Sequence, residues 1–161
     1  MALFNTYVSP VLLYCSEIYC PSLNSHSCLV LEGPLRRFTA TAFQKCRVSY
    51  ESYTDRLSIL NERPFYFRRA KFDLLQAYKI RTGLSQLPIV PWKNSNLPRD
   101  RHRLILCDKI SDTNWFFPRV LKMWNSISKD IGQLKSVEQF KTYLDVIDIA
   151  VLFQHVPFSL Q

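Results

Sequence analysis

Glycine is scarce in this chain, and the scarcity limits the folds that it can form. Three glycines in 161 residues leave too little material for a glycine-rich phosphate-binding loop or a turn-dense β-sandwich. A long apolar run is also missing: the apolar segment 1–20 lacks a basic n-region and is interrupted by Pro10 and Glu17, so it predicts neither a signal peptide nor a membrane span. With 47% hydrophobic residues the chain can still bury a core, and we expect a mainly α fold.

The cysteines lack the CxxC spacing of a metal knuckle. Five cysteines form an odd set, which favours a reducing compartment, nuclear or cytoplasmic, over secretion. A four-ligand zinc site could be formed by Cys15, Cys20, His26 and Cys28. Free cysteines are more often simply buried in a protein core, and we prefer that interpretation.

Basic residues are absent from both ends of the chain. Residues 1–35 and 142–161 contain no Lys or Arg, whereas residues 36–141 hold all 21 bases against nine acids. Such a block attracts polyanions, of which nucleic acid is the commonest, although an acidic protein or an anionic lipid answers to the same charge.

Catalytic patterns are missing as well. There is no Asp-Asp pair, the three histidines are isolated, and GxSxG, HExxH and GxxxxGK[ST] do not occur. Two-metal phosphoryl transfer needs paired carboxylates. We therefore expect no enzymatic activity, no cofactor, no metal and no small-molecule substrate.

Helical spacing of apolar residues predicts four helices in residues 1–83. In 2–19 the expected buried stripe, kinked at Pro10, is Leu3, Tyr7, Val11, Tyr14 and Ile18. The second helix, 27–45, contains Gly33-Pro34, which should break it or start a new one. Ser49 is the expected cap of the third helix, and the fourth should start near Pro64, with Gly83 as its stop. The fourth helix is predicted to be amphipathic. Its apolar side should carry Phe67, Ala70, Leu74 and Ala77 or Tyr78, and a different, positive face should carry Arg68, Lys71 and Lys79.

The helical period is lost between residues 84 and 113. Prolines there, and the basic stretch of Arg99, Arg101 and Arg103, predict a linker with a short strand or hairpin near 104–110. Residues 114–150 then predict a helical pair, the second helix opening with the capping box of Ser136 to Gln139. The expected buried stripe of the first helix of this pair is Phe117, Val120, Trp124 and Ile127, and Trp115 lies just off it. The predicted organisation is about six helices in two subdomains, 1–83 and 114–150, followed by an apolar tail, 151–161.

Three stretches in fixed order carry a family resemblance. The first includes Tyr7-Val8-Ser9-Pro10 and Leu13-Tyr14-Cys15-Ser16; the second includes Leu35-Arg36-Arg37-Phe38-Thr39, Arg68-Arg69 and Asp73-Leu74-Leu75; the third includes Arg119-Val120, Trp124-Asn125-Ser126 and Phe140-Lys141. Together they resemble the region that follows the catalytic palm in reverse transcriptases of non-LTR retrotransposons, especially the jockey-like lineages.

The resemblance implies a thumb-like helical region that holds a template–primer duplex but lacks the palm aspartates. The expected partner is DNA or an RNA–DNA hybrid, bound without sequence preference. Candidate binding residues are Arg36, Arg37, Arg68, Arg69, Lys71, Arg101 and Arg103. Each can equally be an ordinary surface base, and the alternatives to a binding fragment are a helical protein-interaction module and a non-functional mobile-element relic.

Overall fold

The computed structural model describes residues 1–14, 26–86, 91–96, 101–107 and 116–148. As predicted, the fold is mainly α with one short antiparallel hairpin. In chain order the elements are η1, a π-helix (Phe4–Val8), α1 (Ser9–Leu13), α2 (His26–Cys46), α3 (Tyr53–Ile59), α4 (Phe65–Arg81), β1 (Trp92–Asn94), β2 (Leu104–Leu106), α5 (Phe116–Ser126), α6 (Ser128–Ile131) and α7 (Val137–Val146). None of the helices in these ranges combines the length and the apolar character that crossing a bilayer requires.

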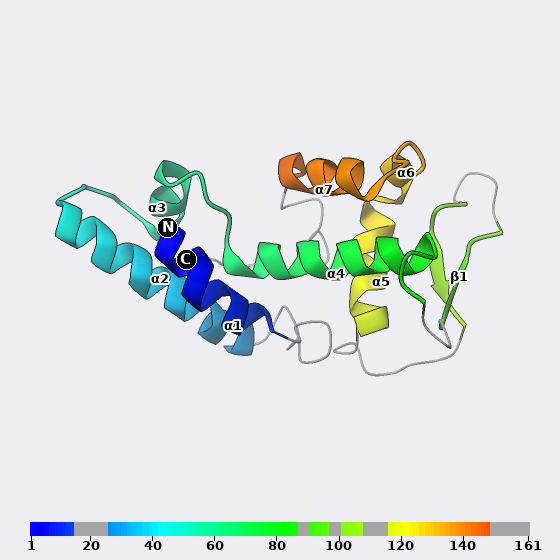
Figure 1. Cartoon of the computed structure of the whole chain (residues 1–161), viewed down its shortest axis with the longest axis horizontal. Coiled ribbons are helices and arrows are strands. Elements are labelled where there is room, and N and C mark those ends of the chain that lie inside the picture. Colours follow the sequence, from blue (N-terminus) through cyan, green and yellow to red (C-terminus); the bar gives the residue numbers. More distant parts are fainter. Residues whose placement is uncertain (15–25, 87–90, 97–100, 108–115, 149–161) are drawn as a thin grey trace.

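Helix α4 runs along the long axis of the molecule and joins its two ends (Figure 1). Helices α1, α2 and α3 lie at its N-terminal end, α7 lies alongside its middle, and α5 and the hairpin lie toward its C-terminal end. The predicted apolar side of α4 is confirmed, because Phe67, Ala70, Leu74, Ala77 and Tyr78 are all buried. Pro64 precedes the first turn, and Gly83, with φ +75°, follows the last.

The larger core joins α4 to the hairpin, α5 and α7. Trp124 is fully buried in it, as predicted, and Tyr78 stacks on Phe140 of α7 with ring centroids 4.6 Å apart. Trp92 and Leu104 of the hairpin belong to the same core. Residues of the expected linker, 84–113, thus contribute to this core, in which α4 packs with α5 and α7.

The smaller core lies at the other end of α4 and contains Phe4, Leu35, Leu57 and Phe65. Beside it, the fully buried carboxylate of Glu32 accepts hydrogen bonds from the backbone N–H groups of Phe65 (3.0 Å) and Tyr66 (3.2 Å). A carboxylate on α2 thus caps the N-terminus of α4, where it also meets the positive end of the helix dipole.

The stripe predicted for the first helix is wrong. Leu3, Tyr7, Val11 and Tyr14 are 69–80% exposed, whereas Phe4, in the next position, is 1% exposed. The side that packs into the smaller core carries Phe4, Val8 and Leu12, each one position after a member of the predicted stripe. Apolar residues occur on both sides of this segment, so periodicity alone could not choose between them. The fifth member, Ile18, lies outside the described residues.

Two further local predictions need correction. Helix α2 continues through Gly33-Pro34 instead of breaking there, and its buried residues on either side of the pair, Glu32 and Leu35, tie it to the rest of the fold. The cap of α3 is Ser52 rather than Ser49, because the Ser52 Oγ accepts from the backbone N–H of Asp55 at 3.1 Å. The predicted Ser136 cap of α7 is confirmed by its bond from Gln139 N, also 3.1 Å.

Candidate nucleic-acid interface

The two neighbouring arginines of α2 have different surroundings. The guanidinium of half-buried Arg36 lies over the ring of Tyr53, 4.6 Å from its centroid, so a cation–π contact stabilises its charge. Arg37 is exposed. Of this pair, Arg37 is the side chain that a phosphate can reach without rearrangement.

The arginine pair of α4 is also divided. Arg69 is 4% exposed, so its guanidinium does not face solvent. Arg68 donates to Glu62 Oε2 at 2.6 Å and to Asn5 Oδ1 at 2.7 Å, and Lys71 pairs with Asp145 of α7. The positive face expected from Arg68, Lys71 and Lys79 is therefore partly neutralised by acids from other elements.

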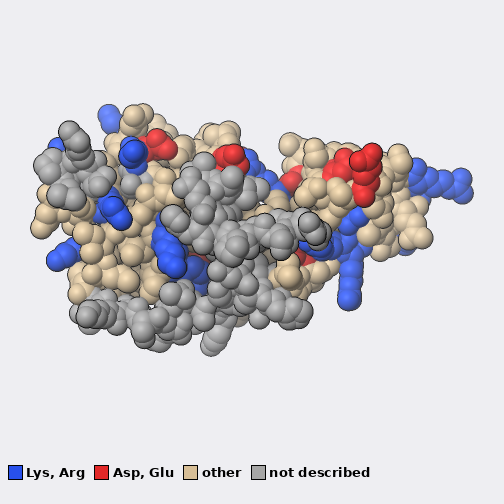
Figure 2. All heavy atoms as spheres, turned by 180° about the vertical axis from the view of Figure 1, so that it is seen from behind, with Lys and Arg blue, Asp and Glu red and all other residues tan. Residues whose placement is uncertain are grey.

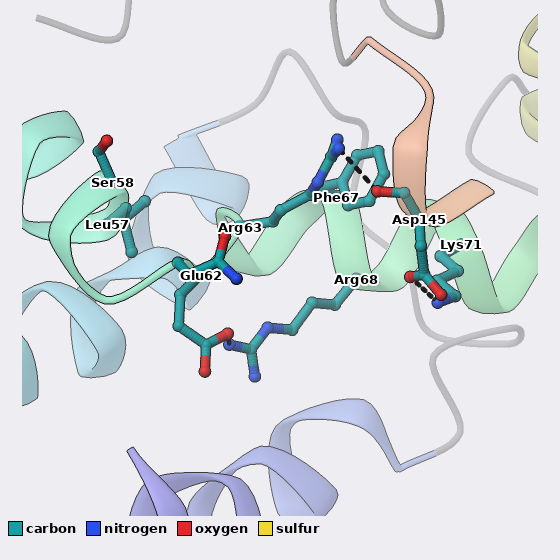
Figure 3. Close-up of a pocket in the computed structure, with 9 residues that line it drawn as sticks. Leu57, Ser58, Glu62, Arg63, Phe67, Arg68, Lys71 and Asp145 are labelled. Carbon is teal, nitrogen blue, oxygen red and sulfur yellow. Dashed lines mark hydrogen bonds and ion pairs between the residues drawn. The ribbon is translucent and has the colours of Figure 1, made fainter. Parts of the chain in front are cut away.

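These ion pairs line a hollow of about 520 Å3 between the start of α4 and the end of α7 (Figure 3). Arg63 reaches across it and donates to the backbone oxygens of Asp145 and Ile147, both at 2.8 Å, while its guanidinium lies over Phe67. Two carbonyls at the end of α7 thereby gain a donor. The charged groups around this hollow already have partners, and their contacts hold α7 against α4.

A second, larger hollow has a different electrostatic character. We call it the basic groove; it has a volume of about 650 Å3 and lies between α1, α4 and α7. Its described lining includes no acid, and its four cations are Arg68, Lys71, Lys79 and Lys141. Lys79 and Lys141 are exposed, and within the described ranges neither forms an ion pair.

Sequence reasoning missed two members of the basic groove, Phe72 and Lys141. The α4 side of the groove has the spacing 68, 72, 75, 79, which is one face of a helix and could have indicated Phe72. Lys141 had no comparable signal, because it reaches the groove only through the packing of α7 on α4.

Arg101 and Arg103 lie apart from the basic groove, next to the hairpin at the C-terminal end of α4. Both are exposed, and the backbone carbonyl of Arg103 accepts from Ser95 N at 2.8 Å. Between them in sequence, His102 Nδ1 lies 2.9 Å from a guanidinium nitrogen of Arg81 on α4. Burial, then Arg81 and Arg101, lower the pKa of this imidazole, so it stays neutral near pH 7.

On the face shown in Figure 2, the described Lys and Arg side chains do not form one continuous patch. They lie over both ends of the molecule, and acidic side chains gather over the end that holds α3. The structure thus brings Arg68 and Lys71 together at the basic groove but leaves Arg37, Arg101 and Arg103 elsewhere. Arg99 and Trp115 lie outside the described residues, as do the side chains of the zinc alternative.

Comparison with known proteins yields one informative match. No protein-family model and no solved structure matches the chain. Over 95 residues the chain is 35% identical to the uncharacterized protein B0403.1 of Caenorhabditis elegans, a match that covers 58% of this chain and 48% of that protein. The matched part thus spans about half of that protein's length, and the name of that protein states no activity.

Proposed function

We propose that this chain is the part of a non-LTR retrotransposon reverse transcriptase that follows the catalytic palm, and that it binds nucleic acid without sequence preference. The observation that carries the binding is the basic groove: its described lining contains no acid, and two of its four cations, Lys79 and Lys141, are exposed and form no ion pair with any described residue. Phosphate contacts of this kind dominate sequence-independent binding.

The family origin is supported by the ordered resemblance in the sequence. Several residues that carry it pack on one another across long sequence separations. Asp73 accepts from the Arg119 Nε at 2.8 Å, and Tyr78 stacks on Phe140, so the second and third stretches are parts of one packed unit. Such packing is expected if the stretches that carry the resemblance descend together from one structural unit.

Binding is tested by fluorescence anisotropy with labelled duplex DNA and RNA–DNA hybrid over a series of salt concentrations. We expect affinity to fall steeply with salt. The double variant Lys79→Ala/Lys141→Ala should lower the slope of log K against log salt by about two, one for each lost phosphate contact.

The matched control removes two exposed lysines that do not line the groove, Lys129 and Lys135. Lys129→Ala/Lys135→Ala makes the same change in net charge, so it separates a local contact from the general field. Equal slopes for the two double variants would reject the groove as the binding surface, and salt-independent or undetectable binding of the unmodified chain would reject nucleic-acid binding itself.

A protein-interaction module is the second candidate, and a separate observation favours it. Leu3, Tyr7, Val11 and Tyr14 expose apolar side chains along the first helical segment. If this surface binds protein, replacing Tyr7 and Val11 with Ser should reduce self-association or partner capture while leaving nucleic-acid affinity unchanged, as sedimentation velocity and anisotropy would show.

A further inference from the structure

The face of α4 that lines the basic groove carries both cations and apolar side chains. Arg68 and Lys79 lie at the two ends of this face, and between them are Phe72, Leu75 and Lys71, which is paired with Asp145. At a rise of 1.5 Å per residue, the two end cations are about 16 Å apart along the helix. The face is long enough for a short run of nucleotides.

Phe72 is unlike the other aromatic residues of α4. Its side chain is 45% exposed, whereas Phe65, Tyr66 and Phe67 are at most 5% exposed. Phe72 lines the groove together with Lys71, its neighbour in sequence, and Lys141 of α7. An exposed ring with positive neighbours suits a ligand that has both a flat apolar face and negative charge.

We infer that the basic groove takes single-stranded nucleic acid, with a base stacked on Phe72 and neighbouring phosphates held by Lys79 and Lys141. This inference rests on the proposed function and narrows its ligand. In a duplex the base faces are covered by stacking, so the backbone alone would reach the ring. An unpaired base offers a free face, and stacking on an aromatic side chain tolerates any sequence.

The shape of the groove supports the same ligand. Pro10 and Leu13 of α1 form an apolar wall, and Val137 of α7 adds to it. A base between such walls leaves water, while its phosphates stay near the lysines at the rim. An acidic peptide shares the negative charge but lacks the planar face, so it is the competing ligand that the experiment must separate.

The experiment compares three labelled probes at one salt concentration: a short oligothymidylate, a hairpin duplex with the same number of nucleotides, and a polyglutamate peptide. Phe72→Ala should weaken binding of the single strand by about five- to a hundredfold, the range expected for loss of one stacked base. Binding of the duplex should stay within about twofold of the unmodified chain, since the lysines remain.

Two further variants show what the ring contributes. Phe72→Leu keeps apolar volume without an aromatic face and should lose as much single-strand affinity as Phe72→Ala. Leu84→Ala removes an apolar side chain that is 68% exposed and outside the groove, and it should have no effect. Because Phe72 is partly exposed, thermal unfolding should show that its variants remain folded.

Three results would overturn the inference: single-strand affinity unchanged in Phe72→Ala, full affinity retained in Phe72→Leu, or polyglutamate bound more tightly than the single strand and lost with Phe72. Any of these with intact, salt-dependent duplex binding leaves the proposed function standing. Loss of salt-dependent binding to every nucleic acid in the unmodified chain would instead remove the proposed function.

Discussion

The side chain of Asn125 forms two hydrogen bonds with the backbone of Leu104, one in each direction. Its Oδ1 accepts from Leu104 N and its Nδ2 donates to Leu104 O, both at 3.0 Å. The amide therefore takes the place of a neighbouring strand beside β2, on the side opposite to β1. This pairing connects the hairpin to α5, which also presents Trp124 Nε1 to the carbonyl of His102 at 2.9 Å.

Asn125→Ala should lower the free energy of unfolding by about 1–3 kcal/mol, because two backbone groups of Leu104 lose their partner in a poorly hydrated position. Urea unfolding measures the loss, and amide hydrogen exchange at Leu104 should become faster. Asn96→Ala, which changes an exposed amide, is the control and should stay within about 0.5 kcal/mol. An equal effect of both substitutions would contradict the strand-like role of Asn125.

The ion pair of Asp73 and Arg119 should be costly to break but replaceable as a unit. Both side chains are at most 4% exposed, so Asp73→Ala leaves a buried guanidinium without its carboxylate and should cost about 3–5 kcal/mol. The double variant Asp73→Leu/Arg119→Met, which removes both charges, should recover most of that loss. Denaturant unfolding tests this.

The pair of Arg68 and Glu62 provides the comparison, because its side chains are 17% and 20% exposed. Glu62→Ala should cost less than about 1 kcal/mol. If removal of Glu62 were as damaging as removal of Asp73, burial would not be what makes the Asp73–Arg119 pair costly to break.

The first helical segment offers a direct test of its corrected register. Phe4 is 1% exposed and Tyr7 is 70% exposed. Phe4→Ala should therefore lower stability by about 3–5 kcal/mol, whereas Tyr7→Ala should change it by less than about 0.5 kcal/mol. Thermal unfolding of the two variants side by side is sufficient. The reverse order would restore the stripe that periodicity predicted.

This register also shows where sequence reasoning succeeds and fails. The apolar sides of α4 and α5 follow an ordinary helical period, so Leu74, Val120 and Trp124 were predicted correctly as buried. In the first segment apolar residues occupy two neighbouring sides of the helix, and periodicity selected the exposed one. A spacing rule cannot tell which of two apolar sides meets the core.

Long-range contacts account for the other failures. Glu32 is an unremarkable acid in the sequence, yet it caps a helix that starts more than 30 residues later. The burial of Arg69 and the neutralisation of Lys71 by Asp145 likewise depend on packing between distant elements. For the candidate site, sequence reasoning identified the basic character and two groove residues, while tertiary packing determined which cations stay exposed.

His102 should make the chain less stable in mild acid. Its folded-state pKa lies below the ordinary value, so between the two pKa values the unfolded chain binds the extra proton and stability falls as the pH drops below about 6.5. His102→Asn should remove this part of the pH dependence. Urea midpoints at pH 7.5 and pH 5.5 measure it, and an undiminished fall in the variant would assign the effect to other groups.

Tyr53 should cause the opposite loss in alkali. Burial, followed by the nearby Glu32 carboxylate that accepts its hydroxyl hydrogen bond, raises the pKa of this phenol above its ordinary value. The unfolded chain therefore releases that proton first, and stability should fall as the pH rises above about 10. Tyr53→Phe should flatten this part of the curve, although the loss of its bond to Glu32 lowers stability at neutral pH. Tyr143→Phe is the matched comparison, because burial and Asp130 raise the pKa of Tyr143 as well. A steep alkaline loss that survives in both variants, and in the two combined, would show that neither phenol controls it.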